Sequence, residues 1–122
     1  MGKAVSAEVL DAAIAVIRQA TRMVAVPGQP ASFAAANAAM LAEVALAAGD
    51  FTTGPGVIDG RRVTVAAKPG VAVTASGTAD HIALLDHVGS RLLYVTTCPA
   101  QALSAGGTVD FAAFDVEFGN PA

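Results

Sequence analysis

The stretch TADHIALLDHVGSRLLYVTTC, residues 78–98, decides the fold. It contains both histidines of the chain, its only cysteine and two Asp-His pairs. These residue types suit either a metal or catalytic site or the central hairpin of a β-protein. If residues 80–86 and 90–98 pair as antiparallel strands, the link HVG at 87–89 is a three-residue turn with Gly89 in the left-handed conformation. The hairpin is the interpretation that we favour.

The two histidines stand six residues apart on the first predicted strand. At about 3.4 Å per residue the Cα atoms of His81 and His87 are separated by roughly 20 Å, whereas imidazoles that share an ion each lie about 2 Å from it. We therefore expect no shared metal. Asp80 and Asp86 are equally far apart, which argues against a paired-carboxylate mechanism. Because neighbours on a strand point to opposite faces, Asp80 and His81 are expected not to form a hydrogen-bonded dyad.

Cys98 precedes Pro99 at the end of the second predicted strand. The hairpin register places it on the same face as Asp80, whose negative charge would raise the pKa of the thiol. We expect a buried structural cysteine rather than a nucleophile. The chain lacks the motifs G-x-S-x-G, H-E-x-x-H and C-x-x-C, and the glycine-rich segment 54–60 lacks the ending of a P-loop. The sequence thus predicts no catalytic, cofactor-binding or metal-binding residues, and a protein that is not an enzyme.

Both faces of the predicted hairpin are apolar. In the expected register one face carries Ile82, Leu84, Leu92 and Tyr94, and the other carries Ala83, Leu85, Leu93 and Val95. An antiparallel sheet with one face in water alternates apolar with polar residues, so the second face needs a cover, either the N-terminal helix or another subunit. The candidate subunit interface is this second face with two residues of the helix: Ala83, Leu85, Leu93, Val95, Ile14 and Ile17.

Two segments before the hairpin predict helices. Residues 5–20 show apolar positions at three- and four-residue spacing, which indicates an amphipathic helix with Ser6 as its N-cap. Residues 32–48 fit a helix by their alanine content and a strand by their alternation. We favour a short helix or turn at 32–38 followed by a strand at 40–47.

The remainder of the chain predicts a β-rich body at 49–118. Regularly spaced turn signals indicate an antiparallel β-sandwich or small barrel, with one N-terminal α-helix, in a single domain spanning 1–122. The other expected elements are strands at 23–26, 61–67, 71–76 and 108–118 and a loop at 99–107. A type II turn KPGV at 68–71 is expected to join 61–67 and 71–76 as a hairpin. In the last strand Phe114, Val116 and Phe118 are expected on one face and Asp115 and Glu117 on the other.

The composition limits the classes of partner that the protein is expected to bind. The net charge is −3 and the seven basic residues are scattered, whereas phosphate binding needs a concentrated positive face, so we expect no nucleic acid. Charged residues break the apolar runs well short of the ~20 residues of a membrane span, so we expect no membrane insertion. Charged residues make up only 14% of the chain, which is typical of a subunit that hides much of its surface in an assembly, although alanine richness gives the same figure.

Three pieces of the sequence resemble a known group of proteins: ASGTADHIALLD at 75–86, RLLYVTTC at 91–98 and LSAGGTVDFAAFDVEF at 103–118. With the opening DAAIAVIRQATRMV at 11–24, they resemble small virion structural proteins of tailed bacteriophages, which are often described as capsid decoration proteins. The resemblance implies a β-rich fold and a purely structural role, and it carries no catalytic residues to this chain.

The function that this resemblance implies is that of a capsid decoration, or cement, protein bound between major capsid subunits. Its expected partners are the major capsid protein and further copies of itself, as in a trimer, and its expected location is the outer capsid surface of a virion made in the bacterial cytoplasm. One alternative is a tail, neck or fibre-attachment protein of the virion. The other is a small carbohydrate-binding β-sandwich, which is disfavoured because the chain has no Trp and a single Tyr for stacking on sugars.

Overall fold

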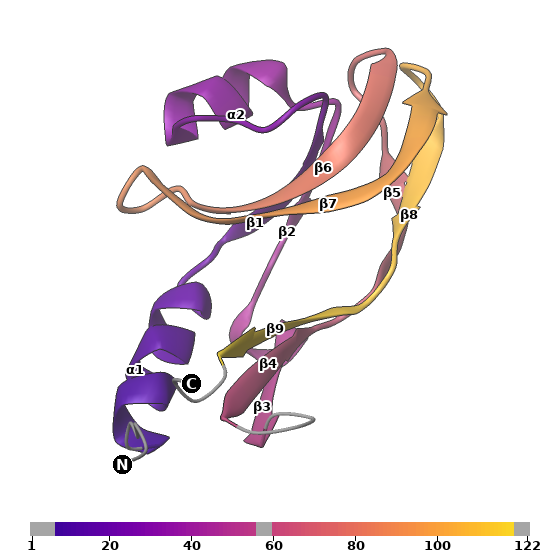
Figure 1. Ribbon diagram of the computed structural model, residues 1–122. Coiled ribbons are helices and arrows are strands. Elements are labelled where there is room, and N and C mark those ends of the chain that lie inside the picture. The colour runs from indigo at the N-terminus through magenta and orange to yellow at the C-terminus, as the bar shows by residue number, and fades with distance from the viewer. Residues whose placement is uncertain (1–6, 56–59, 119–122) are drawn as a thin grey trace.

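The computed structural model describes residues 7–55 and 60–118 (Figure 1). These residues form mainly antiparallel strands, preceded by a helix, as the sequence predicts, and the strands do not close into a barrel. In chain order the elements are α1 (Ala7–Ile17), β1 (Arg22–Val26), α2 (Phe33–Ala39), β2 (Ala42–Ala45), the 3₁₀-helix η1 (Ala48–Asp50), β3 (Phe51–Pro55), β4 (Arg61–Val65), β5 (Lys68–Ala72), β6 (Gly77–Asp86), β7 (Arg91–Leu103), β8 (Thr108–Phe111) and β9 (Phe114–Phe118).

The largest sheet has four antiparallel strands in the order β2-β1-β6-β7. In its middle, Val24 of β1 lies opposite Glu43 of β2 on one side and Ala83 of β6 on the other. The predicted strand at 23–26 is confirmed, and all four of its residues are buried. One face of β1 meets the main core and the other meets α2, which is why its sequence is continuously apolar rather than alternating.

The predicted hairpin of residues 61–67 with 71–76 is wrong. β4 pairs with β3 and β9 in a three-stranded sheet, and β5 pairs with β8 in a two-stranded one. Gly70 has the positive φ, 67°, that the Pro-Gly signal predicts. It lies, however, where the register of β5 on β8 shifts between Lys68 and Val71. A β-bulge and a type II turn both accept a glycine with positive φ, so the local signal does not distinguish them.

β7 is longer than the sequence indicates, because it continues through Pro99 to Leu103. Residues 99–103 of the predicted loop at 99–107 are therefore strand. The register of β6 on β7 shifts between Ala79 and His81, close to this proline. Proline has no N–H to donate and is tolerated at such irregularities.

The predicted strand at 108–118 is divided into β8 and β9 at residues 112–113. The two halves belong to different sheets, since β8 pairs with β5 and β9 pairs with β4. Within β9 the expected alternation holds where side chains are described: Val116 is buried and Asp115 is exposed.

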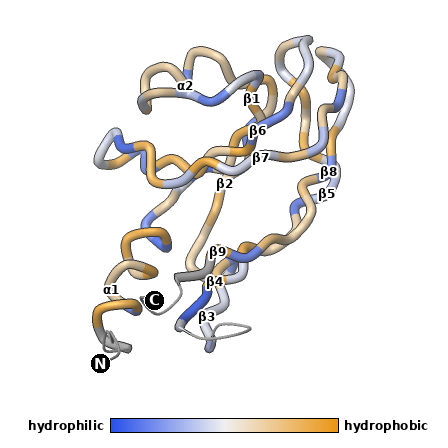
Figure 2. Tube along the Cα trace, viewed as in Figure 1, coloured by the Kyte–Doolittle hydropathy of each residue, from blue (hydrophilic) through white to orange (hydrophobic). Residues whose placement is uncertain are grey.

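The main hydrophobic core lies between the four-stranded sheet and the two smaller sheets. It brings Leu84 of β6 together with Val63 of β4 and Phe111 of β8. Ile14 and Ile17 of α1 belong to the same core, and Figure 2 shows hydrophobic residues along α1 and along β1 and β6. One core thus joins elements from both ends of the described chain.

The two helices differ in how well their ends are predicted. α1 ends earlier than the predicted 5–20, and the predicted N-cap Ser6 lies outside the described residues. α2 confirms the short helix at 32–38: the Ser32 hydroxyl accepts a hydrogen bond of 3.1 Å from the N–H of Ala35, which satisfies a free donor of the first turn. Neither helix among the described residues is long and apolar enough to cross a membrane.

Candidate assembly surface on the β6–β7 hairpin

Residues 78–98 form the predicted antiparallel hairpin, but its register contains an extra residue. Leu84 lies opposite Tyr94, whereas the next residue, Leu85, lies opposite Leu92. Leu93 is therefore unpaired in the ladder. The turn at 87–90 is one residue longer than predicted, which reverses the faces of the positions that follow, and the extra residue at Leu93 restores the predicted faces from Tyr94 onward. Only Leu92 and Leu93 therefore exchange faces: Leu93 packs on the main core and Leu92 on the second face.

The second apolar face of the hairpin exists, and a helix of the same chain covers it. Ala83 and Leu85 are fully buried in a small cluster with Ala36 of α2. Phe33 and Met40, at either end of α2, pack on the same cluster, and Figure 1 shows α2 beside this part of the sheet. The expected cover was the N-terminal helix or another subunit; α2 takes that place.

The candidate subunit interface is corrected by this burial. Ile14 is 1% exposed and Ile17 is 5% exposed, both inside the main core, so neither they nor Ala83 and Leu85 present a side chain to another molecule. Leu93 and Val95 keep partial exposure, but on opposite faces of β7. The six residues do not form one surface.

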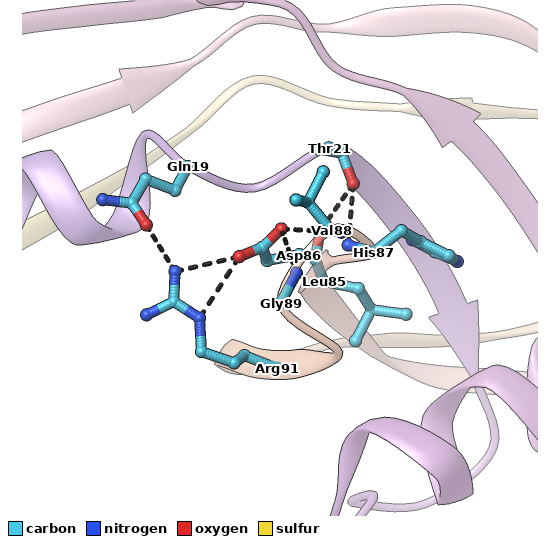
Figure 3. Close-up of polar contacts among 8 residues, drawn as sticks. All are labelled: Gln19, Thr21, Leu85, Asp86, His87, Val88, Gly89 and Arg91. Atoms are coloured by element: carbon cyan, nitrogen blue, oxygen red, sulfur yellow. Dashed lines mark hydrogen bonds and ion pairs between the residues drawn. The ribbon is translucent and has the colours of Figure 1, made fainter.

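The turn of the hairpin is organised by the Asp86 carboxylate, which is only 5% exposed (Figure 3). Its Oδ1 accepts hydrogen bonds from the N–H groups of Val88, at 3.0 Å, and Gly89, at 3.2 Å. Its Oδ2 lies 2.9 Å from Nη2 of Arg91. The Arg91 guanidinium and these N–H donors lower the pKa of Asp86. The turn spans four residues, and Ser90 rather than Gly89 takes the left-handed conformation, with φ 53°.

The same turn is anchored to the link between α1 and β1. The N–H of Thr21 donates to the Leu85 carbonyl at 2.8 Å, and the Thr21 hydroxyl accepts from the N–H of His87 at 3.0 Å. Gln19 accepts a hydrogen bond from the Arg91 guanidinium (Figure 3). The direction in which the hairpin projects is therefore fixed by contacts with a segment that lies some 65 residues earlier in the sequence.

Asp80 and His81 form the hydrogen bond that the strand geometry argued against. Nδ1 of His81 lies 2.7 Å from Oδ1 of Asp80, which also accepts a 2.7 Å bond from the N–H of Gly28. The register shift that follows Ala79 breaks the regular alternation here, so the two neighbours reach the same side. His81 and, secondarily, the Gly28 N–H lower the pKa of Asp80.

His87 lies at the far end of β6 from this pair, beyond the last strand residue. Its ring makes an edge-on contact with Phe33 of α2, with centroids 5.1 Å apart. The two histidines are thus held by different partners. Across residues 7–55 and 60–118, the structure brings together no group of three or more His, Cys, Asp or Glu side chains suited to a metal ion.

A pocket of about 310 Å³ lies between β7 and the chain that joins β8 to β9. Its wall on the four-stranded sheet includes Ile82 and Cys98, and its opposite wall includes Ala113 and Phe114. Cys98 is half-buried, and burial, with the nearby Asp80 charge as a second cause, raises the pKa of its thiol as expected. The pocket itself is not predicted from the sequence, because its two walls meet only through the arrangement of the sheets.

β7 is the edge strand of the four-stranded sheet. It is 13 residues long, and after Arg91 it carries no charged side chain. Its outward backbone groups make no hydrogen bond to another backbone group in the described part of the chain. We call the outer edge of β7 at residues 96–101, together with the adjoining pocket, the docking edge.

The fold and the docking edge define a mainly β protein with an open strand edge, uncharged at residues 96–101, beside a largely apolar pocket. Comparison with models of protein families, with curated proteins and with solved structures finds no match to the chain.

Proposed function

We propose that the chain is a structural protein of a tailed-phage virion that acts as a capsid decoration protein. The observation that carries the proposal, beside the sequence resemblance, is the open edge of β7. Edge strands commonly carry lysine, inward charges or bulges that prevent pairing with other chains. β7 has Pro99 and two register shifts on β6, but no charge from Leu92 to Leu103. Such an edge suits a protein whose role is adhesion.

Decoration is a mechanical task, and polar contacts hold the turn of the hairpin in place. Asp86 and Arg91 hold the turn, and Thr21 attaches it to the rest of the chain. Copies of the protein at symmetric positions on a shell each need only a standard contact, of roughly 1,600 Å² in total. Several weak contacts by one oligomer add to tight attachment, so that internal pressure must break these contacts as well as those of the shell.

The proposal is tested with capsids of the phage that encodes the chain, assembled without it. Purified protein should co-sediment with these capsids saturably and raise the temperature at which they release their DNA. Immunogold labelling of whole virions should place the protein on the head. Label confined to the tail or neck would replace decoration with the tail assignment, and no association with either structure would overturn a virion role.

A further inference from the structure

The geometry points to the docking edge as the site that receives an extended segment of a partner protein, added as a further strand beside β7, with an apolar side chain in the pocket. This inference rests on the proposed function, because the major capsid protein would supply the segment. It goes further by naming the element that is bound and the chemistry of the segment.

The backbone of β7 provides the first requirement. A strand at the end of a sheet presents alternate N–H and C=O groups outward, and an extended peptide satisfies them by adding to the sheet. Residues 96–102 of β7 are exposed or half-buried, and the α2 contacts of the strand fall earlier, at Leu92 and Val95. The C-terminal half of the edge is the accessible half. Within it Pro99 offers no N–H and residues 98–100 fall in the register shift, so the added strand would pair with β7 on either side of these residues.

The pocket provides the second requirement. In an added strand every second side chain points to the same face. Thr96 and Gln101 line the pocket, and they share their face of the sheet with Ile82 and Ala79, which lie opposite them. Side chains of an added strand on that face would lie beside the pocket mouth. The stacked rings of Tyr94 and Phe114, 6.4 Å apart, lie at one end of this region.

The chemistry of the lining selects the segment. Ile82, Leu103 and Phe111 make the floor apolar, which favours an aliphatic side chain at the central position. Two acidic residues lie near it: Asp110 is a lining residue whose Oδ1 accepts a hydrogen bond from the N–H of Gly70, and the Asp80 charge acts on Cys98, which also lines the pocket. An acidic segment would be repelled here, so we infer an apolar centre with lysine or arginine at the ends.

A second copy of this chain is the less suitable occupant. Its large exposed apolar side chains, among the described residues, are Val9 and Val16 on α1 and Val88 in the hairpin turn. None of them lies on an extended, unpaired segment. The apolar residues of β7 itself, such as Tyr94, already pack in their own core. The structure therefore favours a segment from a different protein.

The test uses a fluorescein-labelled peptide, Lys-Thr-Val-Thr-Leu-Thr-Val-Thr-Lys, and fluorescence anisotropy with the full chain. Ala113→Trp places a large ring in the pocket, and Ala72→Trp adds the same ring at an exposed β5 position that does not line it. Because both alanines are exposed, both variants should keep the circular dichroism spectrum of the wild type. We expect saturable binding by wild type and Ala72→Trp, and binding about tenfold or more weaker by Ala113→Trp, as for loss of one buried aliphatic side chain.

Methylation of the peptide amides tests the strand pairing. An added strand points alternate N–H groups at β7 and the others away. Methylating one alternate set should therefore abolish binding, and methylating the other should leave it within about twofold. The inference would be overturned if both methylated peptides bound equally well, or if Ala113→Trp and Ala72→Trp bound the peptide equally well. It would also be overturned if wild type showed no saturable binding, or if the protein associated with itself through β7.

The capsid assay separates the two proposals. If wild type and Ala113→Trp bind capsids equally well, the docking edge is not the attachment site while decoration stands. If the peptide binds as expected but the protein does not bind capsids, the decoration proposal is contradicted and the strand-binding site is supported.

Discussion

The Asp86 carboxylate and the Arg91 guanidinium form an ion pair of 2.9 Å across the β6–β7 turn, with the carboxylate almost completely buried. The pair closes the strand ladder at the end of the hairpin, since Asp86 and Arg91 are also opposite each other in register. The same carboxylate accepts two turn N–H groups. One side chain thus sets both the conformation of the turn and its connection to the following strand.

Replacing this carboxylate should destabilise the protein. Asp86→Ala leaves two turn N–H donors without their acceptor and the Arg91 guanidinium without its carboxylate partner, so we expect the melting temperature to fall by about 5–10 °C. Asp11→Ala is the control, because Asp11 also pairs with an arginine, Arg61 at 2.7 Å, but is half-exposed, and exposed pairs contribute little. Thermal unfolding followed by circular dichroism makes the comparison. Equal effects of the two substitutions would contradict the organising role of Asp86.

Stability should also depend on pH through this group and two others. The pKa values of Asp86, Asp80 and Asp50 are lowered, chiefly by Arg91, His81 and Lys68 respectively. A carboxyl group whose pKa is lower in the folded state stabilises the fold fully above its unfolded pKa, ordinarily 3.8, and that contribution is lost as the pH falls through the folded value.

We therefore expect the free energy of unfolding to be steady down to about pH 5 and to decrease on further acidification. Asp86→Asn removes one of the titrating groups, so its stability should fall less steeply over the same acid range. Urea denaturation at a series of pH values measures both slopes. A wild type that gains stability below about pH 4 would contradict the lowered values.

Because Leu85 is buried within its own chain, truncating it should lower the free energy of unfolding whether or not the protein assembles with other copies. Leu85 is fully buried under α2, so Leu85→Ala should lower the free energy of unfolding of the isolated protein by about 2–5 kcal/mol. Val88→Ala is the matched control: Val88 is 90% exposed, and its truncation should change stability by less than about 0.5 kcal/mol. Urea denaturation at two protein concentrations checks the point. A Leu85→Ala effect that appears only at high concentration would mean that another subunit, rather than α2, covers this face.

The hairpin could be predicted from sequence because its determinants are local. Two apolar segments of similar length flank a polar turn. Once these segments are taken to pair as strands, the two histidines must lie far from each other. The mainly β class follows from the same signals. The partner strands of β4 and β5 are not signalled by the residues near them. The Pro-Gly at 69–70 indicates a turn when the sequence is considered alone, but in the structure it marks a bulge.

The faces of the hairpin could not be predicted because they depend on the turn. Asp86 draws the N–H groups of Val88 and Gly89 to itself, which makes the turn four residues long. Leu93 then becomes the additional residue, and it exchanges faces with Leu92. A second irregularity near Pro99 brings Asp80 and His81 together. Alternation within a strand is a sound rule only between such irregularities.

The pocket of the docking edge is the part of the candidate site most distant from any sequence signal. It exists because the chain crosses between two sheets at residues 112–113 and passes β7 at that point. Neither alanine there is distinctive in an alanine-rich chain. Only the packing of three sheets around one core places this crossing opposite Thr96 and Gln101.

The turn offers a last prediction in which two adjacent residues respond in opposite directions. Ser90 has φ 53°, a conformation that costs a non-glycine residue about 1–2 kcal/mol, against an entropic penalty of about 0.5–1 kcal/mol for glycine. Ser90→Gly should therefore raise the free energy of unfolding slightly, by about 0.5–1 kcal/mol.

Gly89→Ala should lower the same quantity. A Cβ at Gly89 would lie 2.9 Å from Oδ2 of Asp86 and 3.1 Å from Nε of Arg91, so that the methyl group would displace the ion pair, at a cost of about 1–3 kcal/mol. Because both substitutions concern the same exposed turn, each serves as the control for the other in urea denaturation. If Gly89→Ala stabilises and Ser90→Gly destabilises, Gly89 does not lie against the ion pair and Ser90 is not the left-handed residue, which would contradict this description of the turn.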